Sequence, residues 1–130
     1  MGTRAEAFTA AIDAANAGDY GPMLALSDPD VVFEPRRSAV QGKYLGPQGV
    51  EAFWADTTQT FDLFQLTYVD IREAGDFLVA IGTIRVRGRG SGVETTIPSA
   101  AVVEYRGEKV ILFKDYVDAG QALAAAGIEG

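Results

Sequence analysis

The 130-residue sequence contains neither cysteine nor histidine. The lack of cysteine excludes disulfide bonds and thiolate nucleophiles, and the lack of both residues excludes zinc sites of the usual Cys/His type. Any acid–base chemistry must therefore use Asp, Glu, Tyr, Lys or Arg side chains. We expect no metal and no other cofactor.

Positive charge is also scarce, since 11 Lys and Arg residues stand against 18 Asp and Glu residues, for a net charge of −7. A phosphate backbone is bound through clustered positive charge, so we expect no nucleic-acid partner, although Arg85, Arg87 and Arg89 form a local basic stripe. No apolar run approaches the roughly 20 residues of a membrane span, and the first residues lack the layout of a signal peptide. We therefore expect a cytoplasmic protein with no membrane partner.

Helix signals dominate the first part of the chain. Thr3 and Glu6 form a capping box, apolar residues follow at helical spacing, and Gly18 stands where a C-terminal cap belongs. Asp19 then predicts the cap of a second, short helix that runs through Leu26.

The middle of the chain combines turn, strand and helix signals. The composition of residues 27–30 is typical of a turn, and residues 31–34 predict a short strand that ends at Pro35. After a polar loop, residues 46–47 (Gly-Pro) open a third helix that should run to about residue 60.

The second half changes to strand patterns, which cover residues 62–73, 77–89, 92–106 and 109–117. Short turns, most of them containing glycine, separate these runs, so we expect hairpins and an antiparallel sheet. Asp118 with Gln121 resembles a second capping box, at the start of a terminal helix.

Helices first and strands last are typical of a single α+β domain, here residues 1–130. We expect three N-terminal helices on the concave face of a strongly curved, mostly antiparallel sheet, and a short C-terminal helix. Alternation along the second long strand places Gly82, Ile84 and Val86 on the concave face and Arg85 and Arg87 on the convex face.

This order of elements resembles the nuclear-transport-factor-2-like superfamily, and within it the SnoaL-like branch, which includes polyketide cyclases. Ketosteroid isomerase and limonene-epoxide hydrolase are relatives with the same conical fold. The segments that carry the resemblance are residues 18–20 (Gly-Asp-Tyr), 33–35 (Phe-Glu-Pro), 46–47 (Gly-Pro) and 114–118 (Lys-Asp-Tyr-Val-Asp). Members of the superfamily are enzymes, binding proteins or non-catalytic dimer modules, so the fold implies no single function.

Asp115 is the first candidate catalytic residue. Residues 114–118 resemble the Arg-Asp-Tyr-Phe-Asp motif of the epoxide hydrolases, whose first aspartate reaches the pocket. Alternation agrees, because Asp115 faces the helices if Phe113 and Val117 do. A carboxylate among apolar groups has its charged form disfavoured, so we expect a raised pKa, suited to proton transfer. The alternative is a structural carboxylate bonded to a helix terminus or a tyrosine.

Glu34 is the second candidate, because residues 33–35 resemble the Asp-Pro position that supplies the general base of ketosteroid isomerase. Phe33 is the apolar member of the pair, however, and a strand points only one of two neighbours inward unless a bulge intervenes. A solvated glutamate at the strand end is the alternative.

Other polar groups of the relatives are missing. Ala11 and Ala101 occupy the places of the tyrosine and the neutral aspartic acid of ketosteroid isomerase, and Gly82 and Ile84 those of the Arg-x-Asp pair of the epoxide hydrolases. Both named activities are therefore disfavoured. The residues that we expect to bind a substrate are Ile12, Phe33, Trp54, Phe61, Ile84, Val86, Ala101, Phe113 and Val117.

Three functions follow from this pattern. The first is a cofactor-independent isomerase, cyclase, dehydratase or hydrolase that acts on a small hydrophobic, oxygenated molecule, with Asp115 as proton carrier. The second is a binding module for such a molecule, and the third is a dimerisation module with a packed core. The resemblance implies a homodimer through the convex face, where Glu94 and Glu104 would pair with Arg85 and Arg87.

Overall fold

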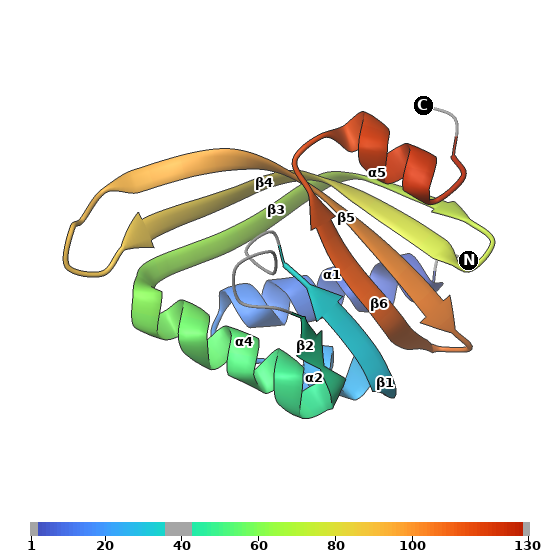
Figure 1. The fold of residues 1–130 in the computed structure, drawn as a ribbon, viewed down its shortest axis with the longest axis horizontal. Helices are drawn as coiled ribbons and strands as arrows, with labels where there is room; N and C mark the ends of the chain where they lie inside the picture. Colours follow the sequence, from blue (N-terminus) through green and yellow to red (C-terminus); the bar gives the residue numbers. More distant parts are fainter. Residues whose placement is uncertain (1–2, 36–42, 129–130) are drawn as a thin grey trace.

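The computed structural model describes residues 3–35 and 43–128. In chain order the elements are α1 (Thr3–Asn16), α2 (Gly21–Leu26), β1 (Ser27–Glu34), β2 (Tyr44–Leu45), α4 (Gly46–Thr60), β3 (Phe61–Ala74), β4 (Phe77–Gly88), β5 (Glu94–Arg106), β6 (Lys109–Tyr116) and α5 (Ala119–Ala125) (Figure 1). This order confirms the predicted α+β class, with helices before the long strands.

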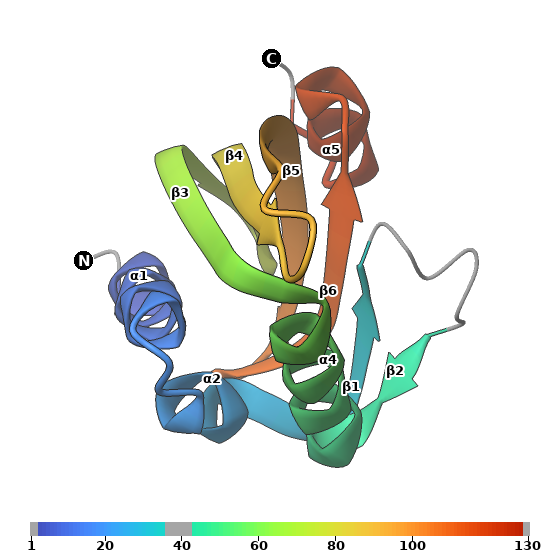
Figure 2. The ribbon, with the colours of Figure 1, turned by 90° about the vertical axis from the view of Figure 1, so that its left-hand side faces the viewer.

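The strands form one open, curved sheet in the order β2-β1-β6-β5-β4-β3. Neighbouring strands are antiparallel except β1 and β6, which are parallel, so the sheet is mixed and mostly antiparallel as predicted. The helices α1, α2 and α4 lie on one side of the sheet and α5 on the other (Figures 1 and 2). Together the curved sheet and these three helices enclose the space that holds the candidate site.

The main core occupies part of this space. On α1 the buried apolar residues recur at helical spacing: Phe8, Ala11, Ile12 and Ala15. On α4 the buried residues likewise share one face: Val50, Phe53, Trp54 and Thr57. Opposite them, the concave face of the sheet contributes alternate residues such as Leu78, Ala80, Ala101 and Val103. The helical spacing of apolar residues predicted for the first helix is therefore confirmed.

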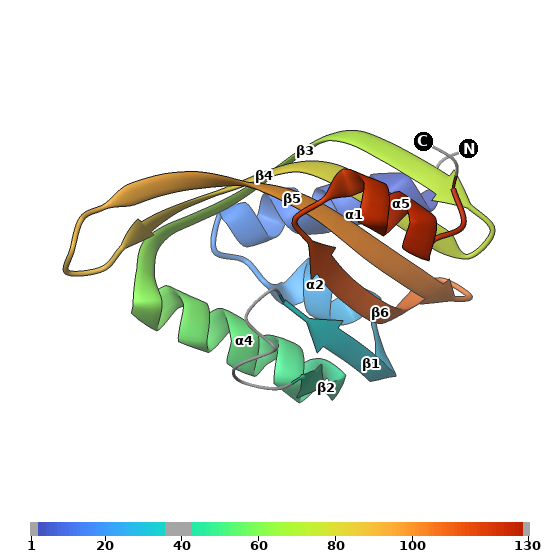
Figure 3. The same cartoon turned by 45° about the horizontal axis from the view of Figure 1, so that its top comes forward.

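A second, smaller core lies on the convex face, where α5 covers part of β4 and β5 (Figure 3). Ala122, Leu123 and Ala126 pack there on Val79 and Val102. The helix begins as predicted, because the Asp118 carboxylate accepts hydrogen bonds from the backbone N–H groups of residues 120 and 121. The convex face is thus divided between this apolar part and a charged part further along β4.

At Gly82 the backbones of β3 and β4 approach each other closely. A Cβ atom at this position would lie 1.8 Å from the carbonyl oxygen of Thr67 and 2.8 Å from Cα of Tyr68, both on β3. Only a residue without a side chain lets the backbones of β3 and β4 approach so closely. Directly beyond the contact, the pairing of β3 with β4 shifts by one residue between Tyr68 and Asp70.

Two local predictions near the second helix need correction. Residues 27–30 do not form a turn but begin β1, because Ser27 pairs with Val110 of β6. The turn signal came from Asp28, whose carboxylate accepts the N–H of Asp30 within an irregular stretch of the strand. Asp19 is not the cap of α2, since Tyr20 holds that position, although the Asp19 carboxylate accepts the N–H of residue 21.

The predicted charge ladder on the convex face is half correct. Glu94 contacts Arg85 at 2.7 Å and Arg87 at 3.7 Å. Asp62 supplies the second partner of Arg87 at 2.7 Å. Glu104 lies opposite Phe77, near the other end of β4, and therefore cannot reach either arginine.

Candidate functional site

A cavity of about 330 Å³ opens between the concave face of the sheet and the elements β1, α2 and α4. Its described lining consists of Met23, Phe33, Pro35, Phe53, Trp54, Phe61, Phe64, Leu66, Tyr68, Ile84, Val86, Ile97, Phe113 and Asp115. This volume lies at the lower end of the range for small-molecule pockets, and the mostly apolar lining is typical of them. The described residues thus leave an open space beneath the helices.

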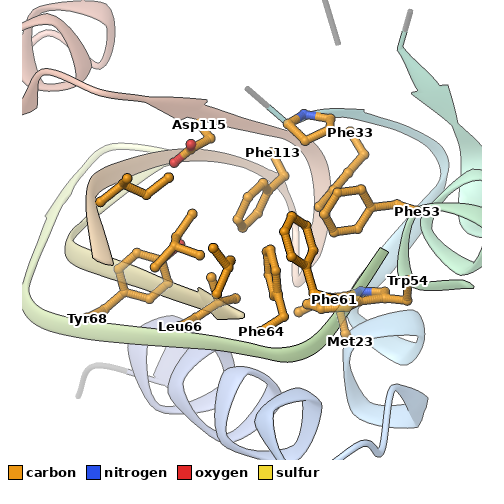
Figure 4. Close-up of a pocket in the computed structure, with 14 residues that line it drawn as sticks. Met23, Phe33, Phe53, Trp54, Phe61, Phe64, Leu66, Tyr68, Phe113 and Asp115 are labelled. Carbon is orange, nitrogen blue, oxygen red and sulfur yellow. The ribbon is translucent and has the colours of Figure 1, made fainter. Parts of the chain in front are cut away.

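Aromatic rings from α4 and β3 form one end of the pocket (Figure 4). The ring of Trp54 packs edge-on against Phe53 at 5.1 Å and against Phe64 at 5.6 Å between centroids. Phe61 lies 6.0 Å from Phe64 and extends this wall. Edge-on packing of this kind fixes ring positions, so the wall is preformed.

Trp54 has a partner for its indole N–H, as a buried tryptophan requires. The N–H points to the sulfur of Met23 at 3.1 Å, and the ring of Tyr20 stacks on the indole at 4.8 Å. The N–H already has a partner within the lining, so Trp54 offers the pocket mainly its apolar ring.

The opposite end of the pocket carries its acidic group, Asp115 (Figure 4). Asp115 lies two residues after Phe113 on β6, and both line the pocket, as alternation along a strand predicts. The hydroxyl of Ser99 on β5 donates a hydrogen bond of 2.5 Å to Oδ1 of Asp115. Because Ser99 is only 1% exposed, its position is fixed by the core, and so is the position of the carboxylate.

Tyr68 is the second polar residue at this end (Figure 4). Its phenol group comes from β3, whereas the carboxylate of Asp115 comes from β6, with β4 and β5 between the two strands. The curvature of the sheet brings both side chains to the same cavity. One hydrogen-bond donor and one carboxylate acceptor therefore face a largely apolar space.

Several predicted site residues line the pocket: Phe33, Trp54, Phe61, Ile84, Val86, Phe113 and Asp115. The others lie elsewhere. Ile12 lines a separate groove between α1 and β3, and Ala101 is fully buried in the core. The expectation for Val117 is wrong, because β6 ends at Tyr116 and Val117 is 52% exposed beyond it.

Glu34 does not line the pocket. Phe33 takes the inward position on β1, so its neighbour Glu34 points away, where its carboxylate lies 4.0 Å from the amine of Lys43. The alternative, a solvated glutamate at the strand end, does not describe this arrangement either, because the Glu34 side chain is only 16% exposed.

Sequence reasoning missed part of the lining: Met23, Pro35, Phe53, Phe64, Leu66, Tyr68 and Ile97. A signal was present for some of them, because Phe64, Leu66 and Tyr68 alternate along β3 in the pattern of one strand face. No comparable signal exists for Met23 on the short α2, which reaches the pocket only through tertiary packing.

Two absences concern the described residues alone. Between residues 3 and 35 and between 43 and 128, no three acidic side chains converge as a metal site would require. In the same ranges no helix has the length and apolar character needed to cross a membrane.

A curved, mostly antiparallel sheet closed by helices around a pocket defines the nuclear-transport-factor-2-like fold class. Residues 8–113 match the family model of the SnoaL-like domain, and the chain belongs to this family. The matched range ends two residues before Asp115, so membership of the family does not assign a role to that carboxylate.

Solved structures agree on the fold. An NTF2-like protein of unknown function from Burkholderia pseudomallei superposes with a TM-score of 0.82 at 22% identity, over 95% of this chain and 97% of that one. TerC, co-crystallized with polyporic acid, superposes with a TM-score of 0.79 at 22% identity, over 95% of this chain and 98% of that one. A proposed SnoaL-like polyketide cyclase from Shewanella denitrificans superposes with a TM-score of 0.76 at 18% identity, over 97% of each chain. No curated protein sequence is significantly similar to this chain. At such identities the likeness shows the fold alone.

Proposed function

We propose that the protein is a cofactor-independent acid–base enzyme that acts on a small hydrophobic, oxygenated molecule, with Asp115 as the proton carrier. The observation that carries this proposal is the Asp115 carboxylate in a pocket that is otherwise almost entirely apolar, held there by Ser99. A positioned carboxylate is a common general acid or base, and a pocket with little water strengthens its interaction with developing charge.

The shape of the pocket supports a flat, partly aromatic ligand. The wall of Phe53, Trp54, Phe61 and Phe64 offers ring faces and edges to such a molecule, while Asp115 offers a single charge to its polar end. That TerC was co-crystallized with polyporic acid and that another relative is named as a SnoaL-like polyketide cyclase supports a small organic ligand for this fold.

The simplest reaction for this pocket is a proton transfer. The carboxylate of Asp115 takes a proton from a carbon next to a carbonyl group, the C–H electron pair forms a new C=C bond, and the carbonyl oxygen becomes an enolate oxygen. Return of the same proton to another atom completes an isomerisation. In a cyclisation the enolate carbon attacks an internal carbonyl, and the alkoxide oxygen that forms takes the proton back from Asp115. Neither outcome requires an oxidant or a reductant.

Proton exchange tests this function without knowledge of the natural substrate. The protein is incubated in D₂O with a panel of bicyclic ketones such as 2-tetralone, and deuterium uptake next to the carbonyl is followed by NMR. We expect Asp115→Asn to slow the catalysed exchange by about 10²–10⁴-fold, the usual contribution of one general base. Asp70→Asn is the matched control, because Asp70 pairs with Arg72 on the surface. Equal exchange rates for wild type and Asp115→Asn would exclude Asp115 as the proton carrier.

The second candidate is a binding module without catalysis. It is favoured by the small number of polar groups. The described lining contains Asp115 and Tyr68, besides Trp54, whose N–H already contacts Met23. Trp54 is the single tryptophan and lines the pocket, so its fluorescence reports occupancy. Saturable quenching by these ketones without deuterium exchange would favour this second function.

We also propose that two copies associate through the charged part of the convex face. Arg85, Arg87 and Glu94 lie there beside the part that α5 covers, and both signs of charge suit a two-fold contact of the surface with itself. Analytical ultracentrifugation gives the mass. If Arg85→Glu remains a dimer like wild type, the contact lies elsewhere on the surface. If wild type is a monomer, the proposed association is refuted.

A further inference from the structure

Met23 of α2 borders two cavities. It lines the main pocket, and it also lines a smaller cavity of about 30 Å³ that is formed by α1, α2, α4, β1 and β6. Two other side chains border both spaces, Phe33 and Phe113. These three side chains therefore form the partition between the main pocket and the small cavity. Figure 4 places Met23 beside Trp54, at the end of the pocket away from Asp115.

The two aromatic members of the partition are fixed in place. The rings of Phe33 and Phe113 stack at 4.8 Å between centroids, and the ring of Phe8 stacks on Phe113 at 6.4 Å. Met23 is the member that is not aromatic, and a methionine side chain is unbranched, with three rotatable bonds. Loss or displacement of this one side chain would therefore join the two spaces.

A contact with Trp54 holds Met23 in its observed position. The indole N–H points to the sulfur at 3.1 Å, and Trp54 is only 4% exposed. If the thioether moves aside, this N–H loses its partner where solvent has little access, which is costly. The backbone of Met23 is tied as well, because its carbonyl oxygen accepts a hydrogen bond of 3.0 Å from the hydroxyl of Ser27. A ligand that displaces Met23 must break the contact with Trp54.

We propose that Met23 is a specificity-determining residue, which closes the small cavity to the ligand and so limits the length of the molecule that the pocket takes. The site then binds compact, ring-shaped hydrophobic ketones and disfavours those with an alkyl chain at the end away from the carbonyl group. This inference rests on the proposed function, in which Asp115 meets the polar end of the ligand. The opposite end of such a ligand points toward Trp54 and Met23 (Figure 4).

Alkyl chains of increasing length on one ring system test this limit. The probes are 2-tetralone and its 6-methyl, 6-ethyl, 6-propyl and 6-butyl derivatives, which carry the chain at the end of the molecule opposite the carbonyl group. Isothermal titration calorimetry measures each dissociation constant, because a substitution of Met23 changes the surroundings of Trp54 and hence its fluorescence.

The effect of chain length should differ between wild type and Met23→Ala. In wild type the affinity should stop rising within this series, where the chain meets Met23. In Met23→Ala each further methylene group that becomes buried should raise the affinity by about fourfold. The ratio of the affinities for the butyl derivative and for 2-tetralone should therefore be about tenfold or more higher in Met23→Ala than in wild type.

Two control variants separate the loss of bulk from other effects. Met23→Leu removes the sulfur but nearly conserves the volume of the side chain, so it should keep the wild-type affinity ratio. Leu24→Ala shortens the next side chain of α2, which lines neither cavity, and should also keep that ratio. A general loss of stability would lower the affinity for all five ketones alike and leave the ratio unchanged.

The outcomes separate this inference from the proposed function. If Met23→Ala has the wild-type ratio, or if wild type gains affinity steadily up to the butyl derivative, Met23 does not limit the ligand and the inference is refuted. If Met23→Ala raises the ratio but Asp115→Asn leaves deuterium exchange unchanged, the proposed function is wrong and Met23 still limits the length of the bound molecule. Absence of binding of all five ketones to the folded wild type would also refute the inference.

Discussion

The hydroxyl of Ser99 and the carboxylate of Asp115 are joined by a hydrogen bond of 2.5 Å that connects the buried middle of β5 to the pocket face of β6. The two residues are diagonal neighbours, since Asp115 pairs with Ala101, two positions after Ser99. A short bond of a hydroxyl to a charged group is among the stronger hydrogen bonds in proteins. Ser99 therefore acts on the pocket through Asp115, as a positioning residue that is not part of the cavity lining.

The first prediction concerns this bond. Ser99→Ala should lower the rate of ketone exchange at saturation by about tenfold with little change in KM, because a carboxylate that has lost this hydrogen bond is less often in the reactive geometry. Loss of the bond should also cost about 1 kcal/mol of unfolding free energy, measured by urea titration. Thr58→Ala, which removes an exposed hydroxyl on α4, is the control. A KM effect alone would show that Ser99 does not orient Asp115.

The second prediction concerns the close approach of β3 and β4 at Gly82. Gly82→Ala places a methyl group against the carbonyl of Thr67, where backbone cannot yield as a flexible side chain would. We expect a loss of about 3 kcal/mol or more of unfolding free energy and weaker ligand binding, since β3 must move together with Tyr68.

Gly120→Ala is the control for that experiment. In α5 the added methyl meets only the end of the Asp118 side chain at 3.1 Å, and alanine favours a helix. This variant should stay within about 1 kcal/mol of wild type. Equal stabilities for the two variants would mean that β3 does not depend on the missing side chain at position 82.

Periodicity within one strand could be predicted from the sequence, but contacts between strands could not. The inward direction of Asp115 follows from Phe113 two residues earlier, because side chains alternate strictly along a strand. The same rule fails for Val117, since β6 has already ended at Tyr116. The bond from Ser99 depends on how β5 and β6 align, and that register is set by the whole sheet.

Tyr68 illustrates a second limit. Its alternation with Leu66 was visible in the sequence, yet its reach into the pocket depends on the close approach at Gly82 and on the shift after residue 68. Such irregularities are not marked by local propensity, because they are stabilised by distant packing. The fold was therefore predictable in outline. At the polar end of the pocket, Asp115 was predictable and Tyr68 was not.

The third prediction is a loss of stability in alkali. Burial raises the pKa of Tyr105 to about 12, although the nearby Arg4 acts in the opposite direction. The folded protein therefore holds this proton where the unfolded chain, with an ordinary tyrosine pKa of 10.0, releases it. The stabilisation is fully present below pH 10 and is lost as the pH rises toward 12. Urea midpoints between pH 8 and 12 should fall more steeply in wild type than in Tyr105→Phe, and parallel curves would contradict this.

The fourth prediction concerns acid and the ion pair of Asp28 with Arg106, which ties the start of β1 to the end of β5 at 2.5 Å. The backbone N–H of Asp30, followed by the hydrogen bond from Arg106, lowers the pKa of Asp28 below its ordinary value of 3.8, against the opposing effect of burial. A lowered pKa in the folded state means that the stabilisation is present above about pH 4 and is lost as the pH falls through the folded value. Asp28→Asn should therefore be less stable than wild type at pH 7, and the difference should shrink toward pH 2. Asp70→Asn, which breaks the exposed pair with Arg72, should change the unfolding midpoint much less at every pH. If Asp28→Asn and wild type differ by the same amount at pH 7 and pH 2, the ionised form of Asp28 is not what joins the two strands.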